Sequence, residues 1–294
     1  MADLLRRPLI LGSRGQLGTE LMRVFADCDV VGLDHSQLEI QDAASVDAAL
    51  EEIRPSVIIN TAAFHNVDAC EADPERAYSV NTLAVDHLAA ASKRRGIAFA
   101  TVSTDYVFDG ESRRPYTESD TPNPINTYGI SKYAGELCVE RHDGPHFIFR
   151  SSGLYGLQAL LQKEKFLERI LRQANAGEEI RVVEDVMFAP SYAPDLAAAM
   201  RGVLEGEHYG LFHVTNTGHC SWFEFASEAL RLSGSQAEIT AIADRDVGTK
   251  TRRPLYSVLA TSRLNDIGIA VPDWRDALAR YLDAYAPVVA RARK

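Results

Sequence analysis

The feature that most limits how this chain can fold is a ladder of three glycines after its first apolar run. That run, Pro8-Leu9-Ile10-Leu11, stops at Gly12, and Gly15 and Gly18 follow, with a helical pattern from Gln16 onward. This order predicts a strand, a tight turn and a helix. Gly12 would permit the turn, Gly15 would let the backbone approach a pyrophosphate, and Gly18 would allow close helix packing. The unpaired N–H groups at the helix amino terminus would face the anion.

A carboxylate follows the next apolar run at the distance that a dinucleotide-binding fold requires. Val30-Val31-Gly32-Leu33 ends at Asp34, about twenty residues after Gly12, where such folds hold the adenosine ribose. Asp34 would repel a 2′-phosphate and favour NADH. Arg14, inside the glycine turn, either reaches that phosphate and favours NADPH or is a solvated loop residue. The coenzyme is therefore NADPH or NADH, with the preference left open.

Strand and helix signals alternate through the first half of the chain. Strands are predicted over 56–60, 97–102 and 146–150, with a long helix over 74–95. Such alternation indicates an α/β fold, a Rossmann-type doubly wound parallel sheet that is covered on both faces and binds ligands at the carboxyl ends of its strands.

The pattern changes after Gly156, and helices are predicted near 163–176, 222–232 and 274–284. We find no repeat and no low-complexity linker. We therefore predict a dinucleotide-binding domain over 1–150. The rest, 151–294, is expected to form mainly a smaller, interwoven substrate-binding lobe, with some segments returning to the first domain.

Composition excludes several other classes of protein. The chain has 294 residues, a formal charge of −10 and a pI near 5.3, without a basic stripe, so no nucleic-acid partner is expected. Its four cysteines form no Cys-x-x-Cys pair and its eight histidines show no metal-ligand spacing, so we predict no metal and no disulfide framework. No signal-like or membrane-length apolar run occurs, and we expect a soluble cytoplasmic protein.

A tyrosine and a lysine carry the candidate chemistry. Tyr128 and Lys132 lie four residues apart and would share one face of a helix. A free phenol titrates near roughly 10, and a neighbouring ammonium would favour its ionised form, moving the tyrosine toward proton transfer with a substrate oxygen. Such pairs also arise by chance as solvated surface pairs. Their position after the glycine ladder favours the catalytic interpretation.

The segment before that helix supplies a second donor. Strand alternation turns either Ser103 or Thr104 into the cleft, and we favour Thr104. Asp105 would orient a substrate hydroxyl or cap the loop. Tyr106 and Phe108 would pack on a substrate or fill the core.

Five segments, in this order along the chain, together point to one family: Gly12-Ser13-Arg14-Gly15-Gln16-Leu17-Gly18, Asn60-Thr61-Ala62-Ala63, Ser103-Thr104-Asp105-Tyr106-Val107-Phe108-Asp109-Gly110, Pro122-x-Pro124-x-x-x-Tyr128-Gly129-x-x-Lys132 and Arg253-Pro254-x-Tyr256-Ser257. Over nearly its full length the chain resembles the dTDP-4-dehydrorhamnose reductase family, within the extended short-chain dehydrogenases/reductases. The resemblance implies an NAD(P)H-dependent oxidoreductase that reduces a nucleotide-linked 4-keto-6-deoxy sugar to dTDP-L-rhamnose, for cell-wall polysaccharide. It is compatible with a homodimer.

The resemblance also implies roles for individual residues. The family's threonine, here Thr104, helps to polarise the sugar ketone, the tyrosine Tyr128 protonates its oxygen, and the lysine Lys132 orients the nicotinamide ribose. With Tyr128 and Lys132, the predicted coenzyme residues are Gly12, Arg14, Gly15, Gln16, Leu17, Asp34, Glu39, Ile40, Ala62 and Ala63. The predicted substrate residues are Asp105, Tyr106, Phe108, Gly153, Arg252 and Arg253.

Some positions depart from the family pattern. Gly153 stands where relatives often place a tryptophan against the sugar, Asp185–Ser191 replaces a stretch that usually carries Gln, Gly and Thr, and Glu39 stands where relatives more often have Asp. The exact sugar is therefore left open. Lys250, Arg252 and Arg253 form a basic loop cluster that would either hold a diphosphate or be solvated.

Two other classes of function remain open. The first is epimerisation or dehydration of a nucleotide sugar, although Thr104-Asp105-Tyr106 lacks the Asp-Glu pair that usually follows the threonine of the dehydratases. The second is a non-catalytic binding role, as in the similar regulatory β-subunit of methionine adenosyltransferase. The presence of Thr104, Tyr128 and Lys132 favours an enzyme.

Overall fold

A six-stranded parallel sheet carries most of the residues singled out above. The computed structural model describes residues 4–157, 164–248 and 251–292. In spatial order the strands are β10 (Gly210–His213), β5 (His146–Ser151), β4 (Ala98–Thr104), β3 (Val57–Asn60), β1 (Pro8–Leu11) and β2 (Val31–Leu33). All neighbouring pairs are parallel. The predicted α/β, Rossmann-type sheet is therefore confirmed, and its outermost strand β10 comes from the second half of the chain.

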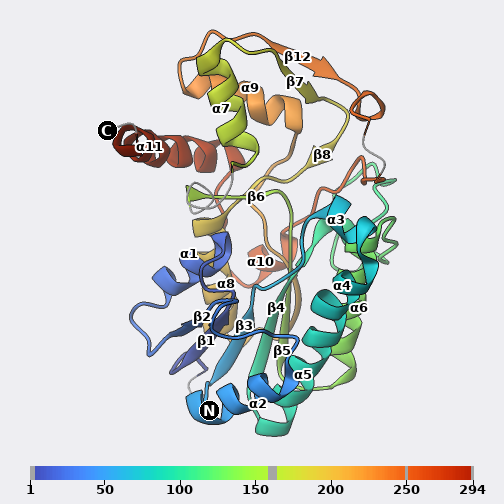
Figure 1. The fold of residues 1–294 in the computed structure, drawn as a ribbon, viewed down its shortest axis with the longest axis vertical. Coiled ribbons are helices and arrows are strands. Elements are labelled where there is room, and N and C mark those ends of the chain that lie inside the picture. The colour runs from blue at the N-terminus through green and yellow to red at the C-terminus, as the bar shows by residue number, and fades with distance from the viewer. Residues whose placement is uncertain (1–3, 158–163, 249–250, 293–294) are drawn as a thin grey trace.

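Alternating apolar side chains bury both faces of this sheet. In β3, for example, Val57 and Ile59 pack on one face and Ile58 on the other. The first face is covered by α1 (Gln16–Val24), α8 (Ala193–Glu205) and α10 (Ser262–Asp266). The second is covered by α2 (Ala43–Ile53), α5 (Ala84–Arg95) and α6 (Thr127–Arg141). Figure 1 shows these two helical layers on either side of the strands.

Most of the elements after residue 153 form a second group beyond the carboxyl ends of the strands (Figure 1). Its helices are α7 (Phe166–Ala176), α9 (Trp222–Leu232) and α11 (Trp274–Ala292). Its short strands pair as β7 (Ile180–Val183) with β12 (Ile239–Ile242), β8 (Met187–Phe188) with β11 (Cys220–Ser221), and β6 (Leu154–Tyr155) with β9 (Ser191–Tyr192). An aromatic core that includes Phe225, Trp274 and Tyr281 joins α9 to α11.

Most of the predicted elements are present, with altered ends. The predicted strands are β3, β4 and β5, and the helix predicted over 222–232 is α9 with the same bounds. The helix predicted near 163–176 begins at Phe166, and residue 163 lies outside the described residues. The helix predicted to end at 284 continues to Ala292, past Pro287.

The long helical pattern predicted over 74–95 is confirmed, but a π-helical turn lies inside it. The segment consists of α4 (Pro74–Tyr78), a π-helical turn (Ser79–Leu83) and α5, preceded by the short α3 (Val67–Ala72). The wider turn lets Asn81 exchange two hydrogen bonds with the backbone of Phe64, at 2.9 Å each, and donate to Ser131 Oγ at 3.0 Å. These bonds link the π-helical turn to the loop after β3 and to α6, and helical periodicity in the sequence does not encode them.

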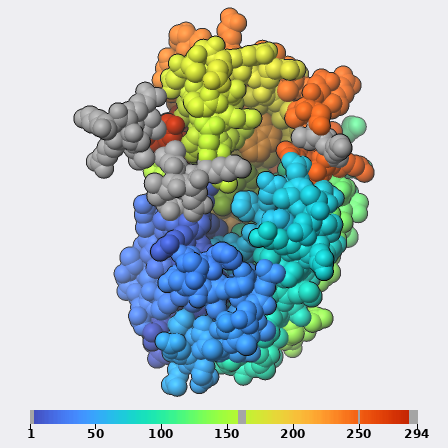
Figure 2. Space-filling view, in the orientation of Figure 1, coloured from blue at the N-terminus to red at the C-terminus, as the bar shows by residue number. Residues whose placement is uncertain are grey.

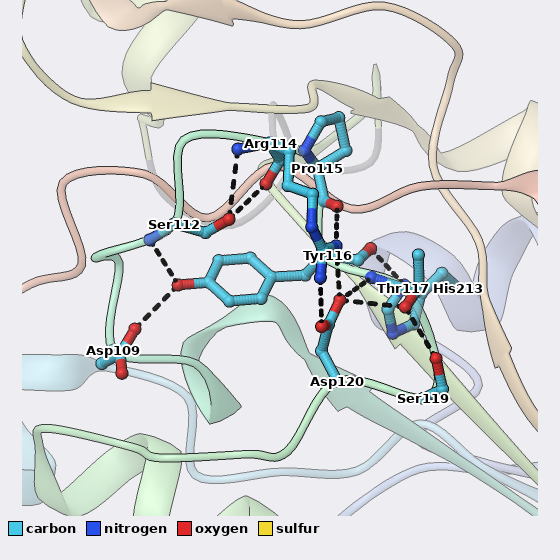
Figure 3. Close-up of polar contacts among 9 residues, drawn as sticks. All are labelled: Asp109, Ser112, Arg114, Pro115, Tyr116, Thr117, Ser119, Asp120 and His213. Atoms are coloured by element: carbon cyan, nitrogen blue, oxygen red, sulfur yellow. Dashed lines mark hydrogen bonds and ion pairs between the residues drawn. The ribbon is translucent and has the colours of Figure 1, made fainter.

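The loop between β4 and α6 is held by its own polar side chains. After a 3-10 turn over Asp105–Val107, the Arg114 guanidinium forms two hydrogen bonds with the Asp120 carboxylate, at 2.6 and 2.9 Å (Figure 3). The Tyr116 hydroxyl donates to Asp109 at 2.7 Å, and the Tyr116 ring stacks on Phe108. These contacts hold the segment that leads into α6 in one conformation.

Candidate active site

One large cleft of about 690 Å³ opens at the carboxyl ends of the strands. Figure 2 shows the surface hollowed between the blue and cyan segments of the first half and the yellow-green segment around α7. The predicted coenzyme residues that line it are Gly12, Arg14, Gly15, Gln16, Leu17, Asp34, Glu39, Ile40, Ala62 and Ala63. Thr104, Asp105, Tyr128, Lys132 and Gly153 line the same cleft.

The glycine turn has the geometry of a pyrophosphate cradle. Gly12 has φ +80°, a backbone conformation that L side chains rarely adopt, and a Cβ on Gly18 would lie 2.2 Å from the Gly12 carbonyl oxygen. Gly15 precedes the first turn of α1, whose amino-terminal N–H groups lack intrahelical partners. Gln16 Nε2 is buried there without a hydrogen-bond partner. A buried donor beside a helix amino terminus fits an anionic dinucleotide.

Arg14 and Asp34 form an ion pair where the adenosine ribose is expected. The Arg14 Nε lies 2.7 Å from Asp34 Oδ2, while Asp34 Oδ1 accepts from the Ser36 hydroxyl and amide at 2.6 and 2.8 Å. The Ser36 hydroxyl, more than any other group, keeps the pKa of the Asp34 carboxyl below its usual value. Asp34, which favours NADH, and Arg14, which would favour NADPH, are therefore in direct contact.

We expect Arg14→Ala to change coenzyme discrimination. Because a charge-assisted hydrogen bond contributes about 1.5–3 kcal/mol, loss of the guanidinium should weaken NADPH binding roughly tenfold or more. NADH should bind within about threefold of the parent, since Asp34 remains to accept from the ribose. Titration of each coenzyme measures the two Kd values. Arg54→Ala, at an exposed arginine outside the lining of the cleft, is the control. Equal weakening of both coenzymes would contradict the assignment.

Tyr128 and Thr104 both line the cleft and lie close to each other. Tyr128 lies in the first turn of α6, which Asn126 caps by accepting from the Gly129 amide at 2.8 Å, and Thr104 ends β4. Burial raises the pKa of Tyr128, and the nearby Thr104 hydroxyl, which lowers that pKa, does not outweigh burial. The phenol therefore keeps its proton at neutral pH, as a proton donor requires. Ser103 also reaches the cleft, but its hydroxyl has no hydrogen-bond partner.

Lys132 is held differently from the sequence-based prediction. It is 5% exposed, its Nζ donates to the Val102 carbonyl at 2.6 Å, and burial lowers its pKa to about 8 although the Glu136 carboxylate opposes this shift. The prediction that this cation moves Tyr128 toward phenolate is wrong for the protein alone, since burial dominates the phenol and raises its pKa. Lys132 remains within the cleft, where an ammonium can bond ribose hydroxyls.

A buried ion pair lies beneath these residues. Glu136, one turn after Lys132 on α6, accepts three hydrogen bonds from Arg150 of β5 at 2.6 to 3.2 Å, and both side chains are 3% exposed. The Arg150 guanidinium also lies over the Phe108 ring. This pair ties the helix that carries Tyr128 to the central sheet.

Four predicted substrate residues do not line the cleft. Phe108 is fully buried and stacks on Tyr116, so the core alternative applies to it. Tyr106 packs edge-on against Tyr128, with ring centroids 5.9 Å apart. Arg252 is exposed, and Arg253 pairs with Asp68 of α3 at 3.2 Å. Lys250, the third member of that basic cluster, lies outside the described residues.

Gly153 occupies a crowded position with φ +48°. A Cβ there would lie 2.4 Å from the Phe188 ring, which in turn stacks on Trp222 with centroids 4.0 Å apart. Aromatic side chains from two later segments thus fill the space behind Gly153. A larger side chain at this position would require Phe188 to move.

Sequence reasoning missed several residues of the cleft. His65, Arg76 and Lys165 bring positive or titratable groups to its wall, Ser151 is the last residue of β5, and Ser152 follows it. Burial lowers the pKa of His65, and the Lys165 ammonium lowers it further, which shows that the two groups are close. The predicted end of the strand over 146–150 could have indicated Ser151 and Ser152 as cleft residues, because ligands bind at such ends. Lys165 belongs to no motif that could have indicated it.

Within the described residues, no group of three or more His, Cys, Asp or Glu side chains could hold a metal ion. No helix of the described ranges is both long and apolar enough to cross a membrane. All four cysteines are free thiols.

A glycine turn, a ribose-level carboxylate and a Thr–Tyr–Lys set at the strand ends of a parallel sheet define the class of extended short-chain dehydrogenases/reductases. Comparison with known families narrows this class. The family model described as RmlD substrate binding domain matches residues 6–286, and the chain belongs to this family.

Similar proteins agree with this family. The dTDP-4-dehydrorhamnose reductase of Burkholderia thailandensis is 36% identical over 289 residues, covering 92% of this chain and 96% of the relative. The spore coat polysaccharide biosynthesis protein SpsK of Bacillus subtilis is 37% identical, with 93% and 96% covered. The crystal structure of a Bacillus anthracis dTDP-4-dehydrorhamnose reductase in complex with NADP superposes with a TM-score of 0.90 at 34% identity, covering 95% of this chain and 99% of that one.

Proposed function

We propose that this protein is an NAD(P)H-dependent reductase that converts dTDP-4-dehydrorhamnose to dTDP-L-rhamnose. The observation that carries the proposal is one cleft that contains the glycine turn, the Thr104 hydroxyl, the Tyr128 phenol and the Lys132 ammonium. Relatives that bear this activity in their names cover nearly the whole chain at 30–36% identity. The coenzyme would occupy the first half of the chain and the nucleotide sugar the wall built after residue 150.

The reaction needs a proton donor and a preorganised site for negative charge. Bound NAD(P)H would supply the hydride to the ketone carbon, and charge then grows on the ketone oxygen. Tyr128 holds the proton for that oxygen because burial raises its pKa. Thr104 would turn its one hydroxyl proton from Asp105 toward that charge, and Lys132, charged below about pH 8, would hold ribose hydroxyls. Cytoplasmic location is part of the proposal, in keeping with four free thiols.

The test is coenzyme consumption with dTDP-4-dehydro-6-deoxy-L-mannose as substrate. We expect one equivalent of NADPH or NADH to be oxidised per equivalent of dTDP-L-rhamnose formed. Conversion of a nucleotide sugar without net coenzyme oxidation would instead indicate an epimerase or dehydratase. Tight coenzyme binding without turnover on a panel of nucleotide keto-sugars would indicate a non-catalytic binding subunit. A homodimer stays a prediction, which light scattering of the purified protein would test.

A further inference from the structure

The carboxylate of Asp105 is buried where the two halves of the chain meet. It is 4% exposed, and three hydroxyls donate to it. Thr104 Oγ1 lies 3.1 Å from Asp105 Oδ1, and the hydroxyls of Ser152 and Ser257 lie 2.7 and 2.5 Å from Oδ2. Ser152 follows β5, whereas Ser257 belongs to a much later segment whose amide bonds to Met187 in β8. Both serines are themselves buried.

These contacts determine how the Thr104 hydroxyl is oriented. A threonine hydroxyl has one proton and two lone pairs. Its proton is directed to Asp105, and its oxygen accepts from the Tyr106 amide at 3.2 Å. The same hydroxyl lies close enough to the Tyr128 phenol to lower the pKa of that phenol. Asp105 therefore holds the Thr104 hydroxyl in place beside the proposed proton donor.

We propose that Asp105 is a positioning residue: its carboxylate fixes the Thr104 hydroxyl beside Tyr128, and Ser152 and Ser257 fix the carboxylate. The inference rests on the proposed reductase function and deepens it. Both carboxylate oxygens already accept hydrogen bonds within the protein, and these bonds carry the positioning role. Because Ser257 comes from the later segment, the carboxylate also joins the substrate wall to the catalytic threonine.

The arrangement requires an ionised carboxylate, since only that form accepts from all three hydroxyls. Burial raises the pKa of Asp105 to about 6, while the bonds from Ser257, Ser152 and Thr104 each oppose that rise. The titratable groups that interact with it are the phenols of Tyr106 and Tyr128, whose raised pKa values keep them neutral. As pH falls through 6, Asp105 gains a proton and the hold on Thr104 weakens.

The experiment compares kcat of the parent, Asp105→Asn and Ser257→Ala across pH 5–8, with coenzyme Kd measured for each. In the parent, kcat should fall below about pH 6. Asp105→Asn should lower kcat about 10- to 100-fold, since misplaced groups cost roughly that much, remove the fall at low pH and keep coenzyme Kd. Ser257→Ala should move the fall to higher pH, because its hydroxyl no longer favours the ionised form. Asp109→Asn, at a carboxylate bonded to Tyr116 outside the cleft, should behave as the parent.

Two outcomes would overturn the positioning role. In the first, kcat of Asp105→Asn still falls at low pH. In the second, kcat of Ser257→Ala falls at the same pH as in the parent. Absence of turnover in the parent would instead reject the proposed function. In that case carboxyl NMR titration of the full chain still tests the Asp105 contacts. A pKa near 6 that rises in Ser257→Ala supports the contacts, and an unchanged pKa contradicts them. Ser257→Ala retains the carboxylate and so remains informative if Asp105→Asn fails to fold.

Discussion

Replacement of Tyr128 by phenylalanine should abolish most turnover while leaving coenzyme binding nearly unchanged. The ring can still pack beside Tyr106, but the proton for the ketone oxygen is gone. General acid catalysis typically contributes about a hundred- to ten-thousand-fold, so kcat should fall within that range. Steady-state kinetics at saturating nucleotide sugar, with coenzyme Kd from titration, measures both effects.

Tyr133→Phe provides the matched control for this experiment. Tyr133 lies on the same helix, packs against the cluster around Phe108, and does not line the cleft. The same loss of one hydroxyl should leave kcat within about twofold. If Tyr128→Phe retained the parent's kcat, the proton would have to come from another group, and the assignment of Tyr128 would be wrong.

Removal of the carboxylate of Glu136 should have the largest effect on stability. The variant Glu136→Ala leaves the Arg150 guanidinium buried and without its carboxylate partner. Breaking a buried ion pair in this way costs about 3–5 kcal/mol of unfolding free energy. Denaturant unfolding, followed by far-UV circular dichroism, should show a lower midpoint.

Asp86→Ala tests whether burial is responsible for this effect. Asp86 pairs with Arg141, at the far end of the same helix, and with His142. That carboxylate is partly exposed, so its loss should cost only about 0–1 kcal/mol. The double variant Glu136→Met with Arg150→Met should recover much of the lost stability, because apolar replacement of both partners is often neutral. Equal losses from Glu136→Ala and Asp86→Ala would contradict the distinction.

Local signals explain which parts of the fold could be predicted. The strand, glycine turn and helix over residues 8–24 depend on neighbours in sequence, and the structure has them as predicted. Helix α9 is defined equally well, since a Ser221 and Glu224 capping box marks its start. The strand ends then bring the predicted coenzyme residues to one cleft, because parallel strands share their carboxyl edge.

The features that could not be predicted depend on distant contacts. The π-helical turn exists because Asn81 bonds to Phe64 and to α6. The partners of Asp105 come from residues 152 and 257, and no spacing rule relates them. The raised pKa of Tyr128 likewise reflects burial rather than the lysine four residues away. In each case the residue could be selected from the sequence, but its hydrogen-bond partners and its burial could not.

The return of β10 and α8 to the first sheet has a consequence for synthesis on the ribosome. Leu196, Met200 and Val203 of α8 cover one face of that sheet, and β10 completes its edge beside β5. A nascent chain that ends near residue 150 therefore exposes an apolar sheet face and an unpaired strand, both of which promote aggregation. We expect the amino-terminal half to remain dependent on chaperones until about residue 213 has emerged, and to be insoluble when expressed alone.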